Sequence, residues 1–312
     1  MQKEKIKSIY ITRIISIALF IAVIAGTLDV WWHGFMGRDS LWEPPHILLY
    51  AAILTAIGLG IYGYYSTREK SWKLIALSLL LVLISAPIDD IWHRIFGVEN
   101  ALSPIIIWSP PHLILVGAII FSLSLLIKEL KKDTAVAQYL FTSISFASIL
   151  SLLLFVVSPF QPIGSYKIIG FYGSFFITLV FIGLLIISER TTKHTGVASL
   201  IALLFIAISA VSFGETADMK GFAPLHDHPP SWVNVFSFLA PAFLIDLTGK
   251  LPNWLRGTLA GFVFTIMLYG LSNIFFASEF QYTISNMWVA VVSGTIGGLI
   301  SGYLLHKKVY MG

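Results

Sequence analysis

The hydrophobic positions of this chain gather into long runs that short polar segments separate. A membrane-spanning helix needs about 20 consecutive apolar residues. Ten runs approach or exceed that length, at 9–30, 46–65, 73–93, 110–127, 138–158, 168–188, 195–213, 232–248, 257–277 and 287–305. The pattern predicts an all-α, polytopic membrane helix bundle of about ten transmembrane helices. We expect residues 1–312 to form a single integral membrane domain.

The composition supports a lipid-facing surface. Hydrophobic residues make up 57% of the chain and charged residues 12%, whereas a soluble domain carries about 25% charged residues. So few charges cannot cover a water-facing surface, which excludes a soluble enzyme. We therefore expect the lipid bilayer as partner, together with other subunits of a membrane complex, and no nucleic acid.

Basic residues lie on alternate connections between the predicted spans. Of the 20 lysines and arginines, all but four fall in the N-terminal segment, the even-numbered connections or the C-terminal segment. The four exceptions are Arg38, Arg94, Lys167 and Lys220. Cytoplasmic loops are enriched in lysine and arginine, so we expect a cell-membrane protein with both termini cytoplasmic. The opposite, extracytoplasmic side holds six of the 8 histidines, which are His33, His46, His93, His112, His226 and His228.

The first and third connections repeat one another in sequence. Residues of the first connection have identical counterparts 60 positions later at its start and 66 positions later at its end. The pairs are Asp29 and Asp89, Trp32 and Trp92, His33 and His93, Gly37 and Gly97, Trp42 and Trp108, Pro44 and Pro110, and His46 and His112. We therefore expect 9–65 and 73–127 to be two parallel copies of one helix hairpin, followed by six further spans within 138–305.

Each copy carries the donor set of a metal site. Asp29 and His33 are one helical turn apart and share a helix face, and Pro44 restarts the chain so that His46 falls in the first turn of the next helix. One carboxylate and two imidazoles suit divalent copper, zinc or iron. The chain has no cysteine, which excludes thiolate ligands. The predicted metal ligands are Asp29, His33, His46, Asp89, His93 and His112, with His226 and His228 as weaker candidates.

Three other interpretations use the same residues. Aspartate–histidine hydrogen bonds could hold helix ends together without a metal. Histidines on neighbouring helices, His33 with His93 or His46 with His112, could hold haem b in a respiratory cytochrome complex. A metal transporter or metal-delivery protein is the third. The spacing leaves open whether the two ligand sets form one shared site or two.

Between Asp29 and His46 the sequence resembles the metal motif of the C subunit of copper-containing membrane monooxygenases, the particulate methane and ammonia monooxygenases. That motif has an aspartate, a histidine four residues later and a second histidine 13 residues after the first, as Asp29, His33 and His46 do here. Further positions follow the motif in order, namely Trp32, Arg38, Asp39, Ser40 and Pro44. The resemblance implies that the three ligands bind copper or zinc, and it implies no substrate.

Taken together, the motif and the resemblance predict an integral membrane metalloprotein that binds copper, with zinc or haem b as the other cofactors considered. We expect an oxidative or electron-transfer role at the extracytoplasmic face. If the chain is an enzyme, it is expected to be a copper-dependent membrane oxidoreductase.

Overall fold

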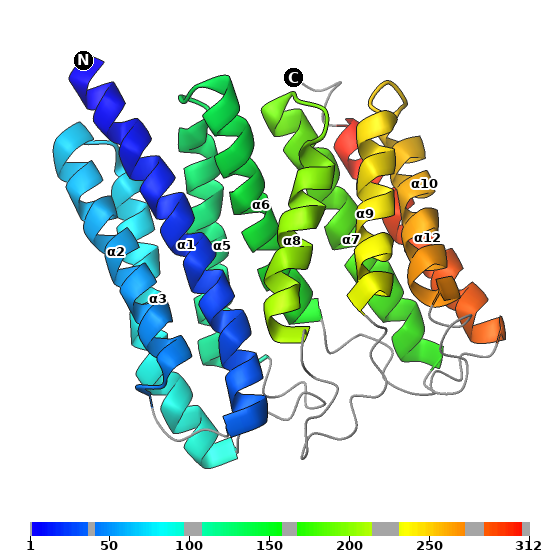
Figure 1. Cartoon of the computed structure of the whole chain (residues 1–312), viewed down its shortest axis with the longest axis horizontal. Helices are drawn as coiled ribbons and strands as arrows, with labels where there is room; N and C mark the ends of the chain where they lie inside the picture. The colour runs from blue at the N-terminus through cyan, green and yellow to red at the C-terminus, as the bar shows by residue number, and fades with distance from the viewer. Residues whose placement is uncertain are drawn as a thin grey trace. The chain divides into compact units, whose positions relative to one another are not determined.

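The computed structural model describes residues 2–36, 41–96, 108–157, 167–213, 231–271 and 284–307, and these residues are helical apart from short turns (Figure 1). The all-α prediction is therefore confirmed for this part of the chain. The helices are α1 (Gln2–Met36), α2 (Pro44–Thr67), α3 (Lys70–Phe96), α5 (Pro110–Leu130), α6 (Ala135–Val157), α7 (Lys167–Thr192), α8 (Val197–Phe213), α9 (Ser231–Leu247), α10 (Asn253–Thr265), the π-helical turn η4 (Ile266–Gly270) and α12 (Ile284–Lys307).

Each of the ten predicted apolar runs overlaps a helix in the part of the chain that the structure describes. Seven of the described helices are long and apolar enough to cross a membrane: α1, α2, α3, α5, α6, α7 and α12. The apolar segments of α8 and α9 are shorter, at Val197–Ala210 and Val235–Leu247, and the α-helical part of α10 stops at Thr265, where η4 begins. The helices indicate a multi-pass membrane protein. The count of ten spans and the side of each terminus stay predictions.

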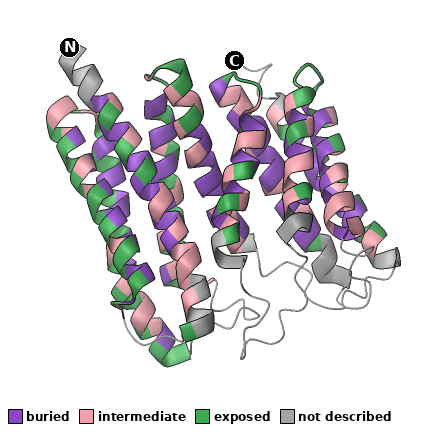
Figure 2. Ribbon diagram, in the orientation of Figure 1, coloured by how far each residue is buried: buried purple, intermediate pink, exposed green. Residues whose placement is uncertain are grey.

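The chain divides into two compact units, Met1–Leu152 and Leu153–Gly312. Unit one contains both predicted hairpins. In it α1 packs on α2, α2 on α3, α3 on α5, and α5 on α1, so these four helices form a closed ring. Their buried residues recur every three or four positions, which brings them onto one face of each helix, while the opposite faces are exposed (Figure 2).

Ion pairs hold the helices of unit one together at the end where α5 stops. Near the start of α3, Lys132 Nζ donates to Glu69 Oε1 at 2.9 Å and to Glu129 Oε2 at 2.6 Å. Burial opposes the charge of Lys132, yet the hydrogen bonds to Glu129 and Glu69 raise its pKa. Arg13 makes two 2.8 Å hydrogen bonds to Asp133, and they lower the pKa of that carboxyl. These pairs connect α1, the turn before α3, α5 and the turn after α5.

Unit two is held by close helix contacts and by buried polar groups. Helix α12 packs on α7 and α10, and α9 packs on α8 and α10. A Cβ atom added to Gly257 or Gly298 would collide with the other residue's carbonyl oxygen, so the two backbones touch directly. The Asp246 carboxylate of α9 accepts hydrogen bonds from Ala198 N at 3.2 Å and from Ser199 N at 2.9 Å, which caps the start of α8.

Candidate metal centre

Helices α3 and α5 position the second predicted ligand set, which we call the Asp89 centre (Asp89, His93 and His112). Asp89 and His93 lie one turn apart near the end of α3, so their side chains share a face. Pro110 opens α5, and Ser109 caps that helix by accepting a hydrogen bond from the His112 backbone N at 3.3 Å. The cap fixes the first turn of α5, and with it the position from which His112 projects.

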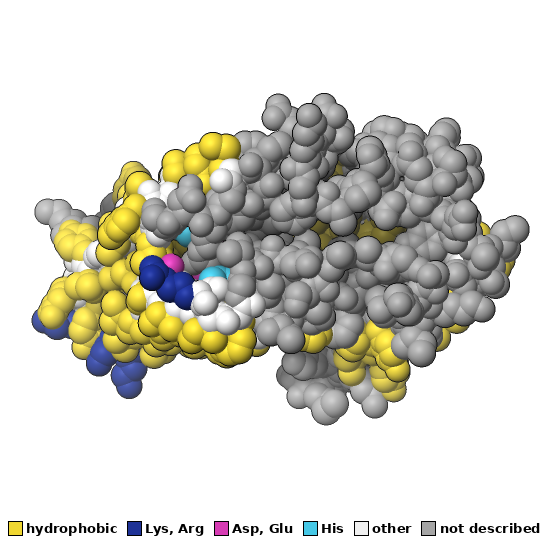
Figure 3. Space-filling model, turned by 90° about the horizontal axis from the view of Figure 1, so that it is seen from below, with side chains coloured by type: hydrophobic (Ala, Val, Ile, Leu, Met, Phe, Trp, Pro, Cys, Tyr) yellow, Lys and Arg dark blue, Asp and Glu magenta, His cyan; other side chains and the backbone are white. Residues whose placement is uncertain are grey.

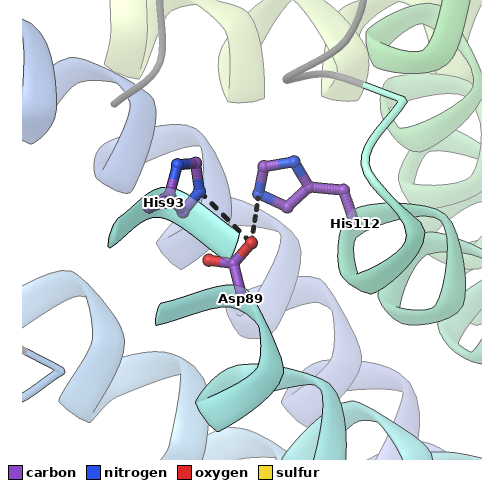
Figure 4. Close-up of side chains that lie close together, drawn as sticks. All are labelled: Asp89, His93 and His112. Atoms are coloured by element: carbon purple, nitrogen blue, oxygen red, sulfur yellow. Dashed lines mark ion pairs between the residues drawn. The ribbon is translucent and has the colours of Figure 1, made fainter. Parts of the chain in front are cut away.

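The three side chains of the Asp89 centre converge on one carboxylate oxygen. Asp89 Oδ1 lies 3.2 Å from His93 Nε2 and 3.4 Å from His112 Nε2 (Figure 4). The two imidazole ring centroids are 5.6 Å apart. The His93 side chain is 2% exposed, against 15% for His112 and 18% for Asp89. From below, histidine and acidic side chains are visible on this end of unit one among hydrophobic neighbours (Figure 3).

These distances fit the edges of a coordination polyhedron. Ligand atoms about 2.1 Å from a metal are separated by about 3.0 Å when they subtend a right angle and by about 3.4 Å at the tetrahedral angle. The donor atoms of the Asp89 centre all lie within 4.8 Å of one another. Hydrogen bonds from nitrogen to oxygen have a typical length of about 2.9 Å, somewhat shorter than both contacts. The donor atoms of the Asp89 centre therefore have the spacing that a divalent transition metal requires of its ligands.

The neighbouring carboxylate, that of Asp90, is paired with an arginine. Asp90 accepts a 2.8 Å hydrogen bond from Arg94 Nε, and the Arg94 side chain is 77% exposed. Among the residues that the structure describes, Asp89 is the aspartate that joins His93 and His112 in this centre, although both aspartates precede His93 in the sequence.

Helices α1 and α2 build a second cluster, the Asp29 centre (Asp29, Glu43 and His46). Asp29 Oδ1 lies 3.0 Å from His46 Nε2. The His46 ring is stacked on Tyr50, with centroids 6.0 Å apart and planes 23° apart, and this contact orients the imidazole. The donor atoms of Asp29, Glu43 and His46 lie within 4.8 Å of one another. Among the described residues the donors thus fall into two groups, one for each hairpin.

The structure brings together five of the six principal predicted ligands, in their two predicted sets. His33 belongs to α1, one turn beyond Asp29, but its side chain lies outside the described residues. His226 and His228 also lie outside the described residues. Whether the assembled residues bind a metal stays a prediction.

Glu43 is the site residue that the sequence analysis missed. Glu43 is 6% exposed and stands at the N-cap position of α2, three positions before His46. An acidic residue so close to His46 was a local signal, but the approach of Glu43 to Asp29 depends on the packing of α1 on α2. The predicted haem pairings were His33 with His93 and His46 with His112, whereas the described imidazoles each face an aspartate.

Comparison with known proteins finds no matching family model, no matching curated protein and no matching solved structure. The donor geometry of the two centres is therefore the basis on which a function can be assigned.

Proposed function

We propose that this chain is a multi-pass membrane metalloprotein that binds one divalent transition metal at the Asp89 centre and one at the Asp29 centre. The observation that carries the proposal is Asp89 Oδ1, which faces imidazole nitrogens from two separate helices at 3.2 and 3.4 Å. A buried carboxylate is costly unless a cation or hydrogen-bond donors compensate it. A metal ion would compensate it and at the same time satisfy both imidazoles.

Copper is the metal we favour for this chemistry. Imidazole and carboxylate ligands without thiolate suit divalent copper, which also binds more tightly than the other first-row divalent ions. The resemblance of Asp29, His33 and His46 to the monooxygenase motif favours the same metal. Bound copper would supply one-electron chemistry, and the role we assign is oxidative or electron transfer at the extracytoplasmic face. The His93 and His112 imidazoles and the Asp89 carboxylate would together bind the ion.

The duplicated hairpin is part of this proposal, and the burial pattern supports it. Buried positions of α3 match buried positions 60 residues earlier in α1, and those of α5 match positions 66 residues earlier in α2. The matched pairs include Ile75 and Ile15, Leu79 and Leu19, Val82 and Ala22, Ala118 and Ala52, and Ile119 and Ile53. The helix contacts α2–α3 and α5–α1 are the two that a two-fold relation between the hairpins would exchange. The ligand sets repeat at the same offsets of 60 and 66 residues. We therefore propose that the two centres arose by duplication of one hairpin.

Metal analysis of the purified full chain tests the proposal. After loading with copper and desalting, the wild-type protein should retain two equivalents, and His93→Ala should retain about one because it removes a ligand of the Asp89 centre. His194→Ala, which changes a histidine outside both centres, should retain the wild-type amount.

Two results would overturn the assignment. Wild-type protein that retains no copper, zinc or iron would show that the Asp–His contacts are hydrogen bonds between helix ends. A Soret band in the visible spectrum, lost in His93→Ala, would assign the histidines to haem.

A further inference from the structure

The two centres differ at the residue that precedes the Pro-Pro pair. Glu43 stands before Pro44 and Pro45, and Ser109 stands 66 positions later before the second Pro-Pro pair. Both residues occupy the N-cap position of their helix, α2 and α5. The duplication therefore places a carboxylate in one hairpin at the position where the other hairpin has a hydroxyl.

Ser109 caps its helix, whereas Glu43 does not. Ser109 Oγ accepts the hydrogen bond from the His112 backbone N, which is the usual task of an N-cap residue. Glu43 makes no side-chain capping bond to α2. One of its carboxylate oxygens instead belongs to the cluster with Asp29 and His46, and the residue is 94% buried, since 6% of its surface is exposed. The carboxylate is thus directed to the ligand cluster and away from the helix end.

From this geometry we propose that Glu43 is a metal ligand of the Asp29 centre and makes the two centres unequal. The inference rests on the proposed function, because it assigns one more ligand to a centre proposed there. With Glu43 the Asp29 centre offers two carboxylates and at least one imidazole. The Asp89 centre offers one carboxylate and two imidazoles.

The difference in charge sets what each centre holds. Two carboxylates balance the charge of a divalent ion, so the described donors of the Asp29 centre neutralise it. At the Asp89 centre the described donors include one carboxylate, which leaves a net positive charge on a divalent ion, and an unbalanced buried charge is costly. That centre should therefore bind a small anion, such as hydroxide or azide, beside its divalent metal, or hold monovalent copper without one.

Ligand type separates the centres in the same direction. Carboxylate oxygens suit harder divalent ions, whereas imidazole is a good ligand for copper. The Asp29 centre should therefore hold its metal in the divalent state, and the Asp89 centre should be the one that exchanges ligands and accepts monovalent copper.

The test measures zinc affinity of the full chain by competition with a chromophoric chelator. The parent is His93→Ala, in which the Asp29 centre is the intact one. Glu43→Gln in that parent keeps the side-chain volume and removes the charge. Loss of an outer partner of a metal ligand already costs roughly 10- to 100-fold in affinity, so loss of a ligand should weaken zinc binding by at least about tenfold. Glu69→Gln removes a carboxylate at the other end of unit one and should leave the zinc affinity unchanged.

A second variant places the carboxylate in the other hairpin, and it tests the role of Glu43 even if Glu43→Gln folds poorly. Ser109→Glu in a His46→Ala parent should strengthen zinc binding at the Asp89 centre and abolish azide binding to its copper-loaded form. Zinc retained at the unaltered centre of the single variant Glu43→Gln reports that the chain is folded.

The outcomes separate the two proposals. If the His93→Ala parent and the wild-type chain bind no zinc and no copper, the proposed function fails. If the parent binds zinc, His46→Ala abolishes that binding, and Glu43→Gln leaves it unchanged, then Glu43 is not a ligand and the proposed function stands. A loss of tenfold or more in Glu43→Gln alone, with Glu69→Gln unaffected, supports the inference.

Discussion

Replacing Gly261 of α10 by alanine should destabilise unit two. A Cβ atom at this position would lie 2.7 Å from the Gly294 carbonyl oxygen, 3.1 Å from Thr178 Cγ2 and 3.2 Å from Gly298 Cα. The 2.7 Å approach is about 0.6 Å shorter than the shortest ordinary carbon–oxygen contact between backbones, about 3.3 Å. Two of the three neighbours are backbone atoms of α12, which cannot move aside by a rotamer change, so α10 and α12 must separate.

The magnitude follows from two opposing effects. Overpacking a close-packed interior costs about 1–3 kcal/mol, and backbone neighbours favour the upper end of that range. Alanine in place of glycine stabilises a helix by about 1 kcal/mol. We therefore expect Gly261→Ala to lower the free energy of unfolding by about 2 kcal/mol, the difference between these two effects.

A chemically identical change elsewhere supplies the control. A Cβ atom at Gly117 of α5 would meet no atom within 4 Å. Gly117→Ala should therefore raise the free energy of unfolding by up to about 1 kcal/mol through helix propensity alone. Reversible unfolding in mixed detergent micelles, followed by circular dichroism, measures both variants. Equal effects of the two substitutions would refute the close approach of α10 and α12.

Three further predictions concern polar contacts. Because Arg13 lowers the pKa of Asp133, the pair stabilises the fold above the unfolded-state pKa of the aspartate and is lost as the pH falls through the folded-state pKa. Asp133→Asn should cost about 1–2 kcal/mol at neutral pH, since Arg13 is 30% exposed and partly screened, and the difference from wild type should vanish in acid; a pH-independent difference would contradict the ion pair. Asp246→Ala should cost about 1–2 kcal/mol because Ala198 N and Ser199 N lose their cap, and unchanged thermal unfolding would count against that role. Ser109→Ala should cost about 1 kcal/mol in the same assay, and an unaffected α5 would show that Ser109 is no cap.

Local sequence pattern was sufficient to predict the helices and the approach of Asp89, His93 and His112 to one another. An apolar run of about 20 residues has one stable form in lipid, the helix, because every backbone group must find its partner within the segment. The i to i+4 spacing of Asp89 and His93, and the proline restart before His112, depend only on helix geometry. These features are fixed within one hairpin and can be read without knowing how hairpins pack.

What the sequence could not predict depends on contacts between distant residues. The partners of Asp246 lie 47 and 48 positions away, so no local pattern identifies them. Glu43 stands at a helix start, where a polar side chain ordinarily serves as a cap. Only the packing of α1 on α2 brings its carboxylate to Asp29 and reveals the additional donor.

X-ray absorption at the copper edge tests the central claim most directly. The sample is the full chain, loaded with copper in detergent and freed of unbound ions, beside a His46→Ala/His93→Ala double variant treated identically. We expect bound copper in the wild type with nitrogen and oxygen ligands at about 2.0–2.2 Å, with imidazole scattering in the outer shell, and loss of that signal in the double variant. Copper retention and an absorption spectrum that are the same in both proteins would contradict the claim that the Asp29 and Asp89 centres bind metal.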